Sequence, residues 1–92
     1  MQAERAQVLS LQALAWLAGE DDMLMAFLQA TGADTGDLRA RAIEPEFQIA
    51  VLDFLMTDDA WVIAFCDAHG FAYTDPAAAR ESLPGGATLH WT

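Results

Sequence analysis

The chain has 92 residues, of which 14 are acidic and 4 are basic, and 54% of all residues are hydrophobic. A chain of this length has room for one domain, which we expect to span residues 1–92, and its apolar content is sufficient for folding. Proteins bind phosphate backbones and anionic membranes through Lys and Arg. The net charge of −10 therefore predicts that neither nucleic acid nor a membrane is a partner. The single cysteine, Cys66, excludes an intrachain disulfide and favours a cytoplasmic location.

The first third of the chain predicts two helices. Apolar residues recur three and four positions apart from about Glu4 to Ala18, and Gly19 ends this helix. The stretch is too short to span a bilayer, and we interpret it as a core helix rather than a signal peptide. A second helix begins at Glu20, where three acids lie beside the positive helix end, and it ends at Gly32 in a left-handed cap.

The middle of the chain predicts a short helix and then a long one. Asp34 and Asp37 resemble a capping box, and we expect a short helix from there through Ile43. Pro45 suits a first helical position, and the following helix is expected to run to Met56. Its apolar residues surround most of the helix, so it is predicted to be the most buried element and to cross the centre of the fold.

The last third predicts two more helices. Thr57 is expected to cap the first of them, which ends at Gly70, and Asp75 is expected to cap the second, which ends at Pro84. The predicted fold is therefore all-α, a compact bundle of about five to six short helices. In the helices after Glu20 and after Thr57, the positions expected to face inward are Met23, Ala26, Phe27, Ala30, Trp61, either Ile63 or Ala64, Phe65 and Ala68.

Two halves of the chain are similar in sequence. Residues 13–32, ALAWLAGEDDMLMAFLQATG, align without a gap with residues 51–70, VLDFLMTDDAWVIAFCDAHG, and seven of the twenty positions are identical. We interpret this as two half-repeats, approximately 4–43 and 45–83, followed by a C-terminal tail, 84–92. The alternative is that two helical segments converged on one binary pattern.

Four residues are the predicted interaction surface. Trp61 is one, because its counterpart 38 positions earlier is the slimmer Met23. The others are His69 at a helix end and, in the tail, His90 and Trp91. Pro84 to Gly86 are expected to form a hinge, and Trp91 is expected to pack near the second half because an exposed indole is costly.

Cys66 and His69 are the strongest candidates for chemistry, because they lie three residues apart on one helix. With Asp67 or His90 they could in principle hold a metal or form a thiol nucleophile, but two ligands do not make a site. We interpret them as a buried thiol and a helix-end imidazole. We therefore expect no metal, no cofactor, no catalytic residue and no enzyme activity.

Four segments, LQALAWLA, MAFLQATG, DLRARA and AVLDFL, carry a resemblance that extends from about Ser10 to Leu83. The chain resembles a group of short bacterial proteins, the domain-of-unknown-function family 3572. The resemblance implies a small cytoplasmic helical protein, and it transfers no catalytic residue.

Three functions remain open from the sequence. We expect a small protein–protein interaction or structural protein that binds itself, as a homo-oligomer, or a basic partner protein. The alternative is an acidic regulator that mimics nucleic acid and binds a basic protein. The third is a metal-binding protein or thiol enzyme that uses Cys66 and His69.

Overall fold

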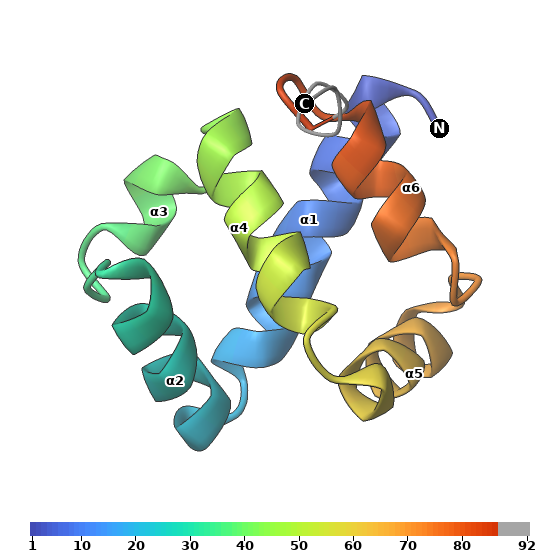
Figure 1. The fold of residues 1–92 in the computed structure, drawn as a ribbon. Coiled ribbons are helices and arrows are strands. Elements are labelled where there is room, and N and C mark those ends of the chain that lie inside the picture. The colour runs from blue at the N-terminus through green and yellow to red at the C-terminus, as the bar shows by residue number, and fades with distance from the viewer. Residues whose placement is uncertain (87–92) are drawn as a thin grey trace.

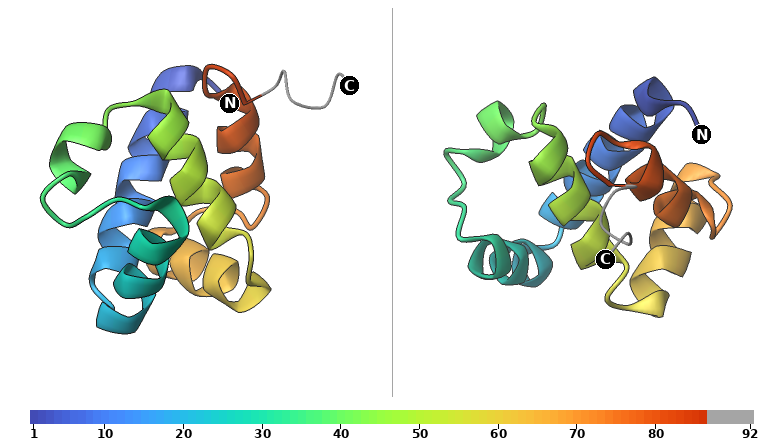
Figure 2. Two further views of the ribbon diagram at one scale, coloured as in Figure 1. Left: turned by 60° about the vertical axis from the view of Figure 1, so that its left-hand side comes forward. Right: turned by 45° about the horizontal axis from the view of Figure 1, so that its top comes forward.

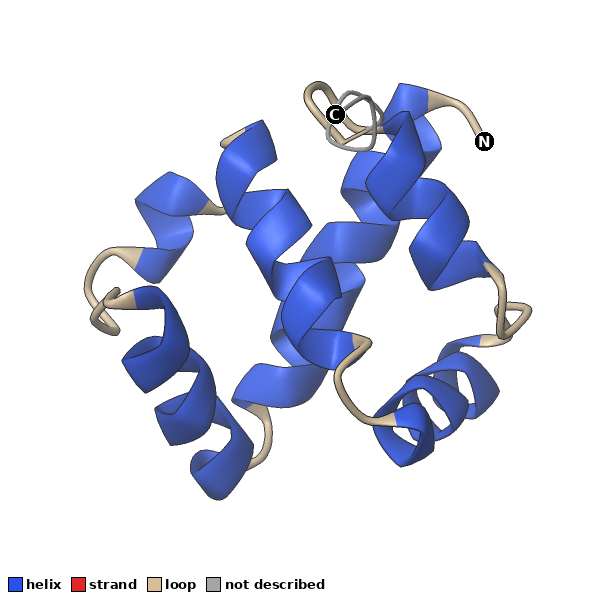
Figure 3. Ribbon diagram, viewed as in Figure 1, coloured by secondary structure: helices blue, strands red, loops and turns tan. Residues whose placement is uncertain are grey.

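The computed structural model describes residues 1–86, and every regular element within them is a helix (Figures 1 and 3). The helices are α1 (Ala3–Ala18), α2 (Asp21–Thr31), α3 (Leu38–Arg41), α4 (Pro45–Leu55), α5 (Asp59–His69) and α6 (Asp75–Ser82). The prediction of a compact all-α bundle of five to six short helices is confirmed. None of the helices in residues 1–86 has the length and apolar character needed to cross a membrane.

Helices α1 and α4 cross at the centre of the molecule, and α6 packs against both (Figure 1). Five of the eleven residues of α4 are buried, against five of the sixteen residues of α1. Helix α4 therefore has the larger fraction of buried residues, as expected for a helix with apolar residues on most of its sides. The core is one cluster of buried side chains, and its largest members are Phe27, Phe47 and Phe65. Figure 2 shows α3 and α6 on opposite sides of the crossed pair.

The two halves of the chain keep the 38-residue register of the sequence alignment. Both bounds of α2, Asp21–Thr31, differ by 38 from those of α5, Asp59–His69. The C-cap glycines, Gly32 and Gly70, have left-handed φ values of 73° and 74°, as predicted, because only glycine adopts this conformation without steric cost.

Aromatic contacts follow the same register. Trp16 meets Phe65 edge to face, with ring centroids 5.9 Å apart, and Phe54 meets Phe27 in the same way at 5.3 Å. Residues 16 and 54, and residues 27 and 65, are each 38 positions apart, so these two contacts hold corresponding places. The first helix of each half packs in this way against the second helix of the other half.

Two predicted helix starts are corrected by the backbone. Asp58, not Thr57, is the N-cap of α5, and its carboxylate accepts a hydrogen bond from the Ala60 N–H at 2.9 Å. The Thr57 hydroxyl instead donates to the Phe54 carbonyl at the end of α4. Asp75 is the first residue of α6 rather than its cap.

The capping of the short helices also differs from prediction. The Asp75 carboxylate accepts from the Ala72 N–H, so it stabilises the turn before α6. The Asp34 carboxylate accepts from the Asp37 N–H at 3.1 Å, as in a capping box, but the helical turn begins only at Leu38. It ends at Arg41, so α3 is shorter than expected.

The inward face of α2 and α5 is rotated relative to the prediction. Four predicted core alanines are exposed, namely Ala26, Ala30, Ala64 and Ala68, and Ile63 is 45% exposed. Phe27 and Phe65 are buried as predicted, but the residues beside them in the core are Leu24 and Leu28 from α2 and Val62 and Cys66 from α5. The bulkier residues on the other side of each phenylalanine occupy the interface, because they bury more apolar area than alanine.

Candidate functional site

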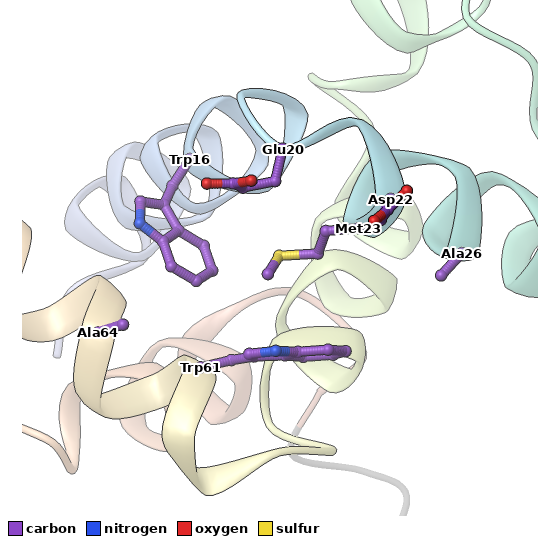
Figure 4. Close-up of a pocket in the computed structure, with 7 residues that line it drawn as sticks. All are labelled: Trp16, Glu20, Asp22, Met23, Ala26, Trp61 and Ala64. Atoms are coloured by element: carbon purple, nitrogen blue, oxygen red, sulfur yellow. The ribbon is translucent and has the colours of Figure 1, made fainter.

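A hollow of about 400 Å³ lies between α2 and α5 and reaches the C-terminal end of α1 (Figure 4). Seven residues line it: Trp16, Glu20, Asp22, Met23, Ala26, Trp61 and Ala64. We call it the α2/α5 hollow. Its volume is within the range of small-ligand and side-chain pockets.

The walls of the α2/α5 hollow come from corresponding positions of the two halves. Met23 and Trp61 are 38 residues apart in the chain, and so are Ala26 and Ala64. The alanines leave the space, because they carry too little side chain to fill it.

Both indoles of the hollow are supported from behind by core rings. Trp61 stacks on Phe54 with centroids 5.2 Å apart and planes inclined by 29°, and Trp16 and Phe65 meet edge to face. Trp16 and Trp61 are each partly buried, so each presents some aromatic surface to the hollow. The aromatic surface of the hollow is thus preorganised by the core.

The rim of the hollow is acidic on the side of α2. In Figure 4 the Glu20 carboxylate extends toward Trp16, and Asp22 lies further along α2. Glu20 is the N-cap residue of α2, yet its side chain makes no capping hydrogen bond, whereas Asp58 at the corresponding position caps α5. Within residues 1–86, neither the Glu20 nor the Asp22 carboxylate has a hydrogen bond or an ion pair.

A second hollow, of about 590 Å³, lies between α1 and α3. Its lining residues are Leu11, Leu14, Ala15, Ala18, Leu38, Arg39, Ala42 and Ile43. We call it the α1/α3 hollow. No acidic residue lines it, and Arg39 is its one charged lining residue.

The corresponding region of the second half is closed by an ion pair. Arg80 of α6 pairs with Asp53 of α4, and a guanidinium nitrogen also donates to the Gly86 carbonyl at 3.2 Å. The residues 38 positions earlier are Ala42 and Ala15, which line the α1/α3 hollow. The first half thus has an open apolar surface where the second half has a polar closure.

Of the four residues predicted as an interaction surface, the structure describes Trp61 and His69, and only one of these lines the α2/α5 hollow. Trp61 lines the α2/α5 hollow. His69 lies at the end of α5 with its ring against Phe65 and Phe71, at centroid distances of 4.8 and 6.4 Å, and it does not line the hollow. His90 and Trp91 lie outside the described residues, as does the predicted packing of Trp91.

Cys66 is buried, and its thiol donates to the Ala72 carbonyl at a Sγ to O distance of 3.4 Å. Burial raises the pKa of the Cys66 thiol, and the negative charges of Asp75 and Asp67 raise it further. These effects disfavour the thiolate that a nucleophile or a metal ligand requires. Within residues 1–86, no three His, Cys, Asp or Glu side chains are placed to hold a metal ion.

The expected hinge at Pro84 to Gly86 is a turn packed on α6. Gly86 is buried, and its N–H donates to the Leu83 carbonyl at 2.9 Å. A Cβ at residue 86 would lie 1.9 Å from the Arg80 carbonyl oxygen, so glycine is required for this close approach.

Comparison with known families gives a match over most of the chain. A family model described as "Protein of unknown function (DUF3572)" matches residues 3–86. The chain belongs to this family. The match confirms the resemblance seen in the sequence, and it covers all six helices of this DUF3572 member. Neither curated proteins nor solved structures gave a match.

Sequence reasoning missed most of both hollows. It did not bring Trp16 and Trp61 to one place, and it interpreted Glu20 and Asp22 only as acids beside a helix end. The free Glu20 side chain had one available signal, the aspartate at position 58, because aspartate is a better N-cap than glutamate. The outer apolar residues of α1 were visible as well, since this helix carries more apolar positions than one buried face requires.

Proposed function

We propose that this protein is a small interaction protein that self-associates through the outer apolar face of α1 and α3. We call this surface the α1/α3 face, and it consists of Val8, Leu11, Ala15, Ala18 and Ile43 around the α1/α3 hollow. The observation that carries the proposal is that this one surface bears both a hollow and a protruding apolar side chain.

Helix α1 is apolar on two sides. Its inward side buries Ala6, Leu9, Ala13 and Leu17. Its outward residues Val8, Leu11, Ala15 and Ala18 are spaced by three, four and three, which is the pattern of a helix seam that packs against another helix. Val8 is 51% exposed and Leu11 is 41% exposed, so this seam has no cover within residues 1–86.

The fit between the hollow and its neighbour supports a second copy of the chain as the occupant. Ile43 is 76% exposed and stands at the edge of the α1/α3 hollow. A twofold contact requires one surface to be complementary to itself, and here Ile43 of one copy can enter the hollow of the other in both directions.

Charge also favours this surface for self-association. Two copies that each carry a net charge of −10 repel one another over most approaches. The α1/α3 hollow has no acidic lining residue and carries Arg39, so opposing carboxylates are fewer there than over most of the surface.

Sedimentation equilibrium at micromolar concentration tests the proposal with two matched variants. Ile43→Glu places a charge in the contact twice per dimer, and we expect it to raise the dissociation constant at least tenfold, because burying each isoleucine contributes about 1.5–3 kcal/mol. Ile63→Glu is the control, since Ile63 is also an exposed isoleucine but lies on α5.

The two variants and the unmodified protein separate the outcomes. A monomer at all concentrations, or an equal effect of Ile43→Glu and Ile63→Glu, would contradict self-association through this face. Circular dichroism of both variants confirms that they fold.

The remaining expectations belong to the same proposal. We infer a cytoplasmic protein, because its one cysteine is unpaired. We infer a bacterial source from the resemblance to a family of short bacterial proteins, and we infer that the halves arose by duplication, because α2 and α5 share one register. We expect neither nucleic acid nor membrane as a partner. No observation favours mimicry of nucleic acid, since first-turn acids, which the helix dipole favours, are spread over five helices: Glu4, Asp21, Asp22, Glu46, Asp59 and Asp75.

A further inference from the structure

We propose that the α2/α5 hollow binds an arginine side chain of a basic partner protein. This site is separate from the α1/α3 face and does not depend on self-association. Its ligand is defined by three features of the hollow: aromatic surface, free carboxylates and the absence of a Lys, Arg or His side chain among its lining residues within residues 1–86.

The aromatic surface suits a flat cation. Trp16 and Trp61 come from different helices and line the same space, with the Met23 thioether beside them (Figure 4). A guanidinium group is planar and weakly hydrated, and it stacks on aromatic rings more readily than a lysine ammonium does. The same chain already contains such a contact, because the Arg41 guanidinium carbon lies 4.7 Å from the centroid of the Phe47 ring.

The carboxylates of Glu20 and Asp22 select a cation that donates hydrogen bonds. Both carboxylates line the hollow, and neither has a partner within residues 1–86. A guanidinium group offers five N–H donors in a fixed plane and can meet a ring and a carboxylate together. A quaternary ammonium has no donor, so it would leave these acceptors without hydrogen bonds.

The arginines of the chain do not fill the hollow. Arg80 pairs with Asp53, and Arg41 contacts Glu44 at 3.6 Å. Arg39 lines the α1/α3 hollow, and Arg5 lines a separate depression near Gln2 at the start of α1. The chain has four basic residues in all, and they are these four arginines. None of these arginines is available to the hollow, so the cation is assigned to a partner, and charge complementarity with a strongly acidic protein favours a basic one.

Nuclear magnetic resonance of the full chain tests the site with three short peptides. The peptides are blocked Gly-Arg-Gly, Gly-Lys-Gly and Gly-citrulline-Gly, and citrulline has nearly the shape of arginine without its charge. We expect the arginine peptide at millimolar concentration to shift the indole N–H signals of Trp16 and Trp61, assigned with Trp16→Phe and Trp61→Phe. The lysine peptide should shift them less, and the citrulline peptide should leave them unchanged.

Two neighbouring aspartates supply a matched pair of variants. Asp22→Asn and Asp21→Asn remove the same charge from the same first turn of α2, but only Asp22 lines the hollow. We expect Asp22→Asn to weaken binding of the arginine peptide about fivefold, as for a partly exposed ion pair. Asp21→Asn should change binding less than about twofold.

Three results would overturn the proposal. They are indole signals that the arginine peptide does not shift, equal shifts with arginine and lysine peptides, and equal weakening by the two asparagine variants. Ile43→Glu should bind the arginine peptide unchanged, so a failure of self-association and a failure of this site are distinguishable. The same spectra show whether each variant keeps the fold.

Discussion

Helices α3 and α6 hold corresponding places in the two halves, but they cover the central helices to different extents. Helix α6 buries Pro76 and Ala79 against the crossed helices α1 and α4. Helix α3 has four residues and none is buried. The comparison shows that two halves with the same order of helices can differ in how far their last helix covers the central pair.

The largest expected effect tests the part that the halves share. Phe27 and Phe65 are both fully buried at corresponding positions. Replacing either phenylalanine with alanine should lower the free energy of unfolding by about 3–4 kcal/mol, because each change leaves a cavity in the same core. Urea unfolding followed by circular dichroism measures both losses.

Phenylalanine-to-leucine variants at the same two positions keep the comparison measurable if alanine unfolds the chain. A loss at one position that is less than half of the loss at the other would show that the two halves do not share the core equally.

A smaller effect on the free energy of unfolding is expected from the N-cap residues of α5 and α2. Asp58→Ala removes the hydrogen bond to the Ala60 N–H and should cost about 1 kcal/mol. Glu20→Ala at the corresponding position should cost less than about 0.5 kcal/mol, because Glu20 makes no capping bond. Thermal unfolding of both variants checks this, and equal losses would contradict the difference in capping.

The ion pair between Arg80 and Asp53 should contribute less to stability than the N-cap of α5 does. Asp53 is about half exposed, so water screens the pair, and Arg80→Met should lower stability by about 0.5 kcal/mol. Arg39→Met on α3 is the control, because Arg39 makes no ion pair within residues 1–86. If both methionine variants unfold at the same urea concentration as the parent, the ion pair does not help to hold α6.

The smallest expected effect is a loss of stability at alkaline pH that arises from Cys66 in the second half. The pKa of the Cys66 thiol is raised by burial from its ordinary value of 9.0, so the unfolded thiol loses its proton first as the pH increases. Above about pH 9 the folded chain then holds more protons than the unfolded chain, and stability falls with rising pH.

Urea unfolding at neutral and alkaline pH measures this slope in the parent and in Cys66→Ala. The variant should lose less stability over the same pH range. The remaining slope should include Tyr73, whose pKa is raised by its hydrogen bond to the Asp67 carboxylate. Identical slopes in the parent and the variant would exclude a thiol contribution.

Most helix bounds could be predicted from the sequence because local signals set them. Gly32 and Gly70 end helices through their own backbone freedom, and Pro45 begins one because its fixed φ suits a first turn. The start of α5 was misplaced by one residue, because Thr57 and Asp58 are both good caps and the choice depends on where α4 ends.

The two hollows could not be predicted because they depend on how helices are placed and rotated. Around Phe27, the sequence allows either Ala26 and Ala30 or Leu24 and Leu28 to face inward, and tertiary packing selects the leucines. That Trp16 and Trp61 line one hollow requires the C-terminal end of α1 to lie close to α2 and α5, which no local pattern specifies. Trp61 alone was visible in advance, as a tryptophan that replaces methionine in the register.

Because Cys66 is buried, the rate at which its thiol is labelled measures local opening of the structure. The thiol points at the Ala72 carbonyl in the segment that joins α5 to α6, so a thiol reagent reaches it only after that segment separates. Since the chain has one cysteine, the labelling rate reports the exposure of this thiol alone. A labelling rate that exceeds global unfolding would mean that the α5 to α6 connection opens while the crossed helices remain packed.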